Sequence, residues 1–126
     1  MLKTTTRTIA IATILSLSVI PAMAGKADVQ AATARKTGNS WQISATIKHG
    51  DEGWKHYANS FQVLTMEGKV LGTRVLYHPH VDEQPFTRSV ANVQVPVGVT
   101  EIIIRAHDSK HGDGERIFKL KLPKRK

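Results

Sequence analysis

The sequence predicts an all-β protein, built as an antiparallel sandwich of about seven strands. Apolar and polar residues alternate with a period of two through most of the chain after residue 24. Turn-forming residues interrupt this alternation at roughly 12-residue intervals. No segment keeps the 3.6-residue period of an amphipathic helix. Together these observations favour two packed sheets of short strands.

The clearest strand is expected at 41–47, where Trp41, Ile43, Ala45 and Ile47 alternate with polar residues. Other strands are expected at 61–65, 70–77, 86–95, 100–107 and 117–122, with a weaker one between 28 and 35. Glu67-Gly68-Lys69 predicts a hairpin turn, and 111–114 a second turn. The three consecutive isoleucines 102–104 are typical of a strand buried on both sides.

This strand pattern predicts a single immunoglobulin-like or fibronectin-like sandwich over residues 25–122. The Cys pair of antibody domains is missing, so the analogy concerns architecture only. A small closed barrel is the alternative.

The N-terminus has the pattern of a cleavable signal peptide over residues 1–24. Lys3 and Arg7 precede an apolar stretch at 9–20, Pro21 follows it, and Ala22-Met23-Ala24 offers the small residues that a signal peptidase reads. We expect cleavage after Ala24 and a periplasmic or secreted protein. The apolar stretch is short for a permanent anchor, so no transmembrane anchor is expected in the mature form.

The net charge of +8 is unevenly distributed. Removing Lys3 and Arg7 with the leader leaves +6, and five basic residues near the C-terminus account for most of it: Lys119, Lys121, Lys124, Arg125 and Lys126. The basic tail at 123–126 is either a solvated end or a contact for anionic surfaces. No basic stripe with interleaved aromatic residues is present, so nucleic-acid binding is not expected.

Four of the six histidines fall in two segments at strand-to-loop junctions, 77–86 and 107–112. His78 and His80 share one face of an extended backbone that Pro79 stiffens. If both segments lie at one end of the sandwich, they supply six candidate metal ligands: His78, His80, His107, His111, Glu83 and Asp108. Because the chain has no cysteine, this nitrogen and oxygen set favours Cu(II) or Zn(II) over Cu(I).

Two other interpretations of the histidines stay open. They could serve as structural hydrogen-bonding groups, or form a recognition surface for a partner. An enzyme is the least favoured class. Ser89 and Ser109 lack a nucleophile-elbow motif, and Asp82 and Glu83 are adjacent, so on a strand they would face opposite ways, unlike a glycosidase pair. A small metal-dependent hydrolase is the enzyme that stays open.

Trp54 and Tyr57 form a further feature, in a loop that follows Asp51-Glu52. We expect the two rings to plug one end of the sandwich, since aromatic residues bury most of their area. The alternative is an exposed pair that binds sugar or peptide.

Three segments, GWKHYANSFQVLTMEGKVLGTR, LYHPHVDEQPFTRSV and VPVGVTEIIIRAHDSKHGDGE, resemble a family of small exported bacterial proteins with no established biochemical activity. The resemblance covers about residues 41–122, and the HPHxxEQPFTRS segment is its most specific part. It implies an exported β-domain and gives the histidine segments more weight than Trp54 and Tyr57.

The sequence therefore predicts an exported, non-catalytic binding module of unknown ligand. A transition-metal ion bound by the two histidine segments is one candidate for that ligand. The alternative is a protein-protein interaction module of the bacterial envelope. The expected partner is an envelope protein or a small ligand, and no catalytic residue is assigned.

Overall fold

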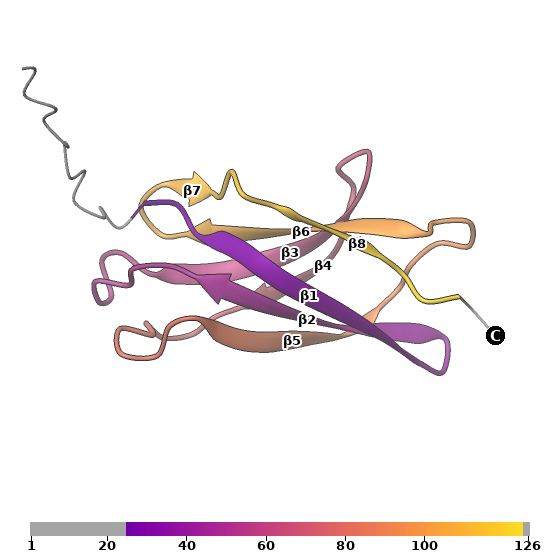
Figure 1. Ribbon diagram of the computed structural model, residues 1–126, viewed down its shortest axis with the longest axis horizontal. Helices are drawn as coiled ribbons and strands as arrows, with labels where there is room; N and C mark the ends of the chain where they lie inside the picture. The colour runs from indigo at the N-terminus through magenta and orange to yellow at the C-terminus, as the bar shows by residue number, and fades with distance from the viewer. Residues whose placement is uncertain (1–24, 125–126) are drawn as a thin grey trace, which may run out of the picture.

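A computed structural model describes residues 25–124, and the predicted signal peptide and residues 125–126 lie outside the described residues. The described chain forms two antiparallel sheets packed face to face, which confirms the predicted all-β sandwich (Figure 1). One sheet has the order β1-β2-β5, with strands β1 (Asp28–Thr37), β2 (Ser40–Lys48) and β5 (Phe86–Val93).

The second sheet is centred on β3 and β6 and has the order β4-β3-β6. Its strands are β3 (Ala58–Thr65), β4 (Val70–Val75), β6 (Glu101–Asp108), β7 (Gly112–Asp113) and β8 (Phe118–Lys121). Strands β7 and β8 both pair with β6, at opposite ends of it. This strand order is that of an immunoglobulin-like sandwich, with β1, β2 and β5 in the places of strands A, B and E.

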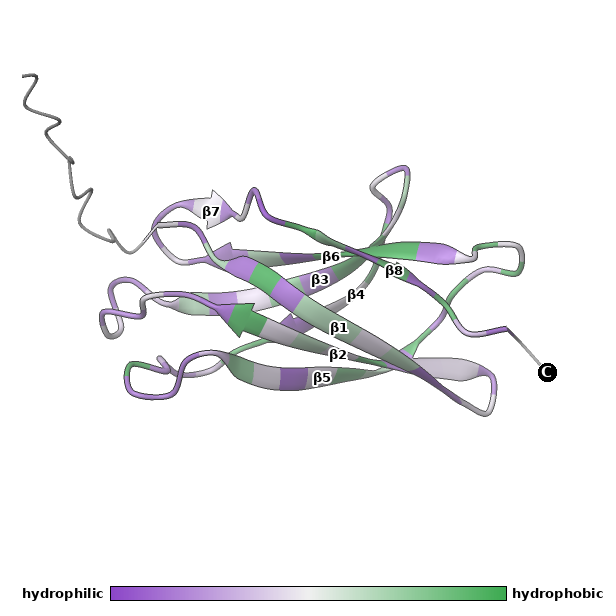
Figure 2. Cartoon of the chain, viewed as in Figure 1, coloured by the Kyte–Doolittle hydropathy of each residue, from purple (hydrophilic) through white to green (hydrophobic). Residues whose placement is uncertain are grey.

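The strands form where period-two alternation allows one face to be buried. In β2 the side chains of Trp41, Ile43, Ala45 and Ile47 are buried, and polar residues stand between them. In β6 the buried side chains are those of Ile102, Ile104 and Ala106, whereas Ile103 is half-buried. The isoleucine run is therefore a central strand that still alternates. Figure 2 shows apolar residues concentrated in the strands.

The core between the sheets contains three large aromatic side chains, those of Trp41, Phe61 and Phe86, each at most 2% exposed. The face of β2 and β5 turned away from the core has paired hydroxyl groups, Ser44 with Ser89 and Thr46 with Thr87.

Turns and loops join the strands much as predicted. The Thr65 and Lys69 backbones close the β3–β4 hairpin, with Gly68 at a φ of 93°. The expected turn at 111–114 contributes instead the two residues of β7. Within residues 25–124, no helix is long and apolar enough to span a membrane.

The entry of the chain into β1 is fixed by close packing against Gly114. A Cβ atom on Gly114 would stand 2.0 Å from the backbone oxygen of Ala27, and the Gly114 amide donates to the Ala106 oxygen at 2.8 Å. Ala27 is itself fully buried. The segment that precedes β1 is therefore held against β6 and the loop after β7.

We expect Gly114→Ala to lower the free energy of unfolding by about 1–3 kcal/mol, because the new methyl group forces the backbone at Ala27 to move. Urea denaturation measures the change. Gly68→Ala is the control, since open space surrounds that position and only its positive φ opposes the substitution, at a cost of about 1 kcal/mol. A Gly114→Ala variant as stable as the wild type would contradict the close packing.

Candidate functional site

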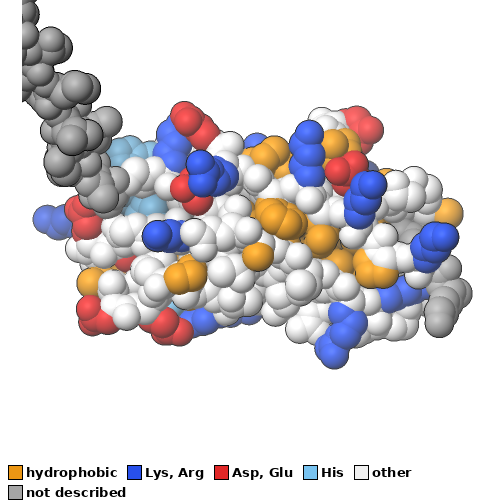
Figure 3. All heavy atoms as spheres, in the orientation of Figure 1, with side chains coloured by type: hydrophobic (Ala, Val, Ile, Leu, Met, Phe, Trp, Pro, Cys, Tyr) orange, Lys and Arg blue, Asp and Glu red, His pale blue; other side chains and the backbone are white. Residues whose placement is uncertain are grey.

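Three loops lie at one end of the sandwich. They contain five of the six histidines, and the sixth, His107, lies near the end of β6 beside one of them. These loops are 49–57 between β2 and β3, 76–85 between β4 and β5, and 109–111 between β6 and β7. Residues 25–27 arrive at the same end, at the left of Figure 1. Histidine side chains are visible there in the space-filling view (Figure 3).

Three buried side chains at this end form the candidate site: His49, His56 and Asp108. Each offers one ligand atom, and these atoms lie within 4.8 Å of one another. The His56 Nε2 and Asp108 Oδ1 atoms are 3.3 Å apart, and the rings of His49 and His56 meet edge to face with centroids at 4.7 Å. All three residues are at most 3% exposed.

The three residues share a register, because each continues the core-facing side of a strand by one step. His49 follows Ile47 of β2, His56 precedes Ala58 of β3, and Asp108 follows Ala106 at the end of β6. In extended backbone, residues two apart lie on one face. The apolar core therefore ends in a buried polar cluster.

Several polar atoms of the cluster have no hydrogen-bond partner among residues 25–124. They are both ring nitrogens of His56 and the Oδ2 atom of Asp108. The Glu52 carboxylate is 3.7 Å from His56 Nδ1, too far for a hydrogen bond. An unpaired buried polar atom costs about 1–3 kcal/mol, so atoms left in this way call for a functional explanation.

Asp108 is set up to remain ionised. Burial alone would raise the pKa of its carboxyl group, but the backbone amides of His111 and Lys110 donate to Oδ1 at 2.6 and 2.9 Å and outweigh that effect. The charge of nearby histidines acts in the same direction, and the pKa lies below its usual value. The carboxylate is thus charged at neutral pH, as a metal ligand must be.

His49 is oriented by a second carboxylate. Its Nδ1 atom lies 2.5 Å from Asp51 Oδ1, and its Nε2 atom donates to the Gly25 carbonyl oxygen at 2.8 Å. Carboxylates that fix histidine rings in this way recur behind metal-binding histidines. The side chain of Asp51 is fully buried.

Of the six ligands predicted from the sequence, Asp108 belongs to this cluster and His111 borders it. The rings of His111 and His56 are 4.8 Å apart, edge to face, and His111 is exposed. The side chain of His107 lies apart from the cluster and bonds Asn59 Oδ1 through Nδ1 at 2.6 Å.

His78, His80 and Glu83 belong to a second group in loop 76–85. His80 is buried and stacks on Phe86 at 4.0 Å, with His78 at 4.7 Å on the solvent side. Arg88 Nη2 lies 3.0 Å from His80 Nε2, which must accept because a guanidinium only donates. His78 and Glu83 are exposed.

The environment of His80 disfavours its charged form. Burial contributes most, and the positive charge of Arg88 and the proximity of His78 add to it, so the pKa lies below its usual value despite Asp51 and Glu83.

The sequence did not lead us to His49 or His56. No signal pointed to His56, because the pairing register of β3 shifts between Ala58 and Ser60. For His49 a signal was available. Extending the alternation of the predicted strand 41–47 by two residues places His49 on the buried face. Our prediction that Trp54 plugs the end of the sandwich is wrong, because its side chain is 69% exposed and packs only edge to face on Tyr57. His56, between these two aromatics, is the residue that turns inward.

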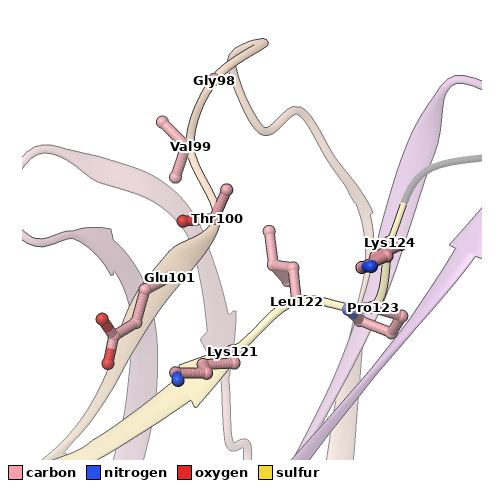
Figure 4. A pocket seen from close by; sticks show the side chains of 8 residues that line it. All are labelled: Gly98, Val99, Thr100, Glu101, Lys121, Leu122, Pro123 and Lys124. Atoms are coloured by element: carbon pink, nitrogen blue, oxygen red, sulfur yellow. The ribbon is translucent and has the colours of Figure 1, made fainter.

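An apolar recess lies at the other end of the sandwich. Figure 4 shows it between Val99, Leu122 and Pro123, with Glu101 and Lys121 along its edge. It has no histidine and is separate from the buried cluster.

The lowered pKa of His80 predicts a dependence of stability on pH. The unfolded chain binds a proton at His80 more readily than the folded chain, so stability is lost as pH falls below about 6.5. We expect His80→Gln to lose less unfolding free energy than the wild type between pH 7.5 and 5.5, as measured by urea denaturation. His107→Gln is the control, because His107 bonds Asn59 and does not contribute to the shift of His80. Equal losses in the wild type and His80→Gln would contradict the prediction.

No protein-family model matches the chain. Over 77 residues the chain is 43% identical to a protein of Halomicrobium mukohataei whose name reads "Putative lipoprotein". The match covers 61% of this chain and 37% of that protein, so the chain spans little more than a third of the relative's length.

Proposed function

We propose that the protein is an exported domain that binds one divalent transition-metal ion, Zn(II) or Cu(II), through His49, His56 and Asp108. The observation that carries the proposal is the set of buried atoms without partners, the two ring nitrogens of His56 and Asp108 Oδ2. An ion between the three side chains would satisfy them.

The spacing of the candidate ligands supports this proposal. Two ligands at 2.0–2.1 Å from a tetrahedral ion lie about 3.3 Å apart. The 3.3 Å between His56 Nε2 and Asp108 Oδ1 agrees with that value. The ligand atom of His49 lies within 4.8 Å of the other two, so a small inward movement of its ring would let it bind the same ion.

The chemistry of the ligands defines the class of ion. Imidazole nitrogen with carboxylate oxygen suits Zn(II), Cu(II) and Ni(II). The two buried carboxylates, Asp51 and Asp108, balance the charge of a divalent cation. His111, whose ring borders His56, is the candidate for an additional ligand from the solvent side.

Export is supported by the signal-peptide pattern of residues 1–24 and by the name of the haloarchaeal relative, which describes a lipoprotein. From that name we infer only the exported location of this chain.

The test is calorimetric titration of the processed protein with Zn(II) and with Cu(II). We expect one ion per chain. The affinity for the ion should be at least about 100-fold weaker in His56→Gln and in Asp108→Asn, which each lose a ligand. It should be about 10–100-fold weaker in Asp51→Asn, which loses the carboxylate that orients His49. A bound ion at 100 times its Kd also adds about 2.7 kcal/mol to stability.

His78→Gln and His107→Gln are the matched controls, because both histidines lie outside the cluster and should leave the affinity unchanged. Absence of binding in the wild type, or equal weakening in His78→Gln and His56→Gln, would overturn the proposal.

A second candidate function, docking on an envelope protein, has support from exposed apolar side chains at the same end. Trp54, Tyr77 and Val81 are 69%, 76% and 54% exposed. Large apolar side chains exposed on one end of a domain are candidates for an interaction site.

For this second function we expect crosslinking in whole cells to yield an adduct that the double variant Trp54→Ser, Tyr77→Ser loses while it still binds metal. An adduct that persists in the double variant would exclude these side chains as the docking surface.

A further inference from the structure

We infer that removal of the leader completes the metal site, because cleavage after Ala24 makes Gly25 the N-terminal residue and its α-amino group and carbonyl oxygen then bind the same ion. The inference rests on the proposed metal site, and it adds two ligands and a maturation step to it.

The first support is the contact between Gly25 and His49. The carbonyl oxygen of Gly25 lies 2.8 Å from His49 Nε2, and since a carbonyl only accepts, Nε2 carries the hydrogen. Two ligands that bind an ion at right angles with bonds of 2.0–2.1 Å stand about 2.9 Å apart. An ion can therefore replace this hydrogen, with little movement of either atom, and the proton is released.

The second support is that the chain holds Gly25 in place. Ala27, two residues on, is fully buried, and its backbone oxygen faces Gly114. The Lys26 ammonium group pairs with Glu115 at 3.0 Å. Beyond them, the Val29 amide donates to the Arg116 oxygen at 3.1 Å. The residue that cleavage would make N-terminal thus starts beside the cluster and needs no folding step to reach it.

The third support is the chemistry of a free amino terminus. In the unprocessed chain the Gly25 nitrogen belongs to a peptide bond, and its lone pair is delocalised into the carbonyl group. After cleavage the amine has an available lone pair. With the carbonyl oxygen of the same residue it closes a five-membered chelate ring around a metal ion.

The completed set favours Cu(II). It consists of the Gly25 amine, one nitrogen each from His49 and His56, and oxygens from Gly25 and Asp108. Nitrogen-rich sets with ligands at right angles are typical of Cu(II), which also binds most tightly among the divalent first-row ions.

The experiment compares two full-length chains exported with their own leader. One has the natural sequence, and the other has two serines inserted between Ala24 and Gly25, so that cleavage leaves Gly25 inside a peptide bond. The mass of each purified protein gives the cleavage site. Cu(II) affinity is measured by competition with a chelator of known affinity, and electron paramagnetic resonance is recorded with glycine labelled by ¹⁵N.

We expect the natural chain to start at Gly25 and to bind Cu(II) at least about 30-fold more tightly than the inserted chain. We also expect ¹⁵N-glycine to change the nitrogen hyperfine pattern only in the natural chain. Equal affinities with an unchanged pattern, or cleavage elsewhere, would overturn the inference and leave the His49, His56 and Asp108 site standing. Absence of Cu(II) and Zn(II) binding in both chains would overturn the inference and the proposed function together.

Discussion

The end of the sandwich that bears the candidate site depends on one buried carboxylate, that of Asp51. Its Oδ1 atom accepts from the Ala58 amide at 3.0 Å and lies 2.5 Å from His49 Nδ1, while Oδ2 accepts from the His80 amide at 2.6 Å. A buried carboxylate is tolerated only when such bonds replace its water. Asp51 therefore ties the end of β2, the start of β3 and loop 76–85 to one point. Gln84 strengthens the link, because its side chain accepts from the His49 amide and donates to the His80 oxygen.

The fold could be predicted because period-two alternation depends on local sequence and one buried face. The predicted strand at 41–47 corresponds to β2, and the predicted strand at 100–107 to β6, each within about two residues. Even the weak strand between 28 and 35 forms, as β1, where half-buried alanines alternate with polar residues. The pairing of Gly112–Asp113 with β6 was not predicted, because a strand of two residues is too short to show a periodic pattern.

The candidate site was only partly predictable, because it is assembled from loops whose approach depends on the whole topology. We predicted His78 and His80 as ligands because they are close in sequence. The two rings are neighbours in space, but His80 contacts Arg88 and Phe86 rather than Asp108, and His78 is exposed. His49 and His56 stand apart from both histidine segments in sequence. What brings them to Asp108 is a shared inward register at the ends of β2, β3 and β6. Following the alternation of β2 beyond Ile47 leads to His49. In β3 the pairing register shifts between Ala58 and Ser60, so the alternation does not lead back to His56.

Because the core ends in imidazoles and carboxylates, the two ends of the sandwich are not held together by the same kind of contact. Toward the recess of Figure 4 the sheets meet through apolar side chains. At the opposite end buried polar side chains lie between them, and several of their atoms lack partners in the described part of the chain. Proteins open locally most often in regions with few buried apolar contacts. The backbone amides of loops 49–57 and 76–85 should therefore exchange with deuterium first. Breathing of this kind would give solutes a way into a site that is closed in the resting fold.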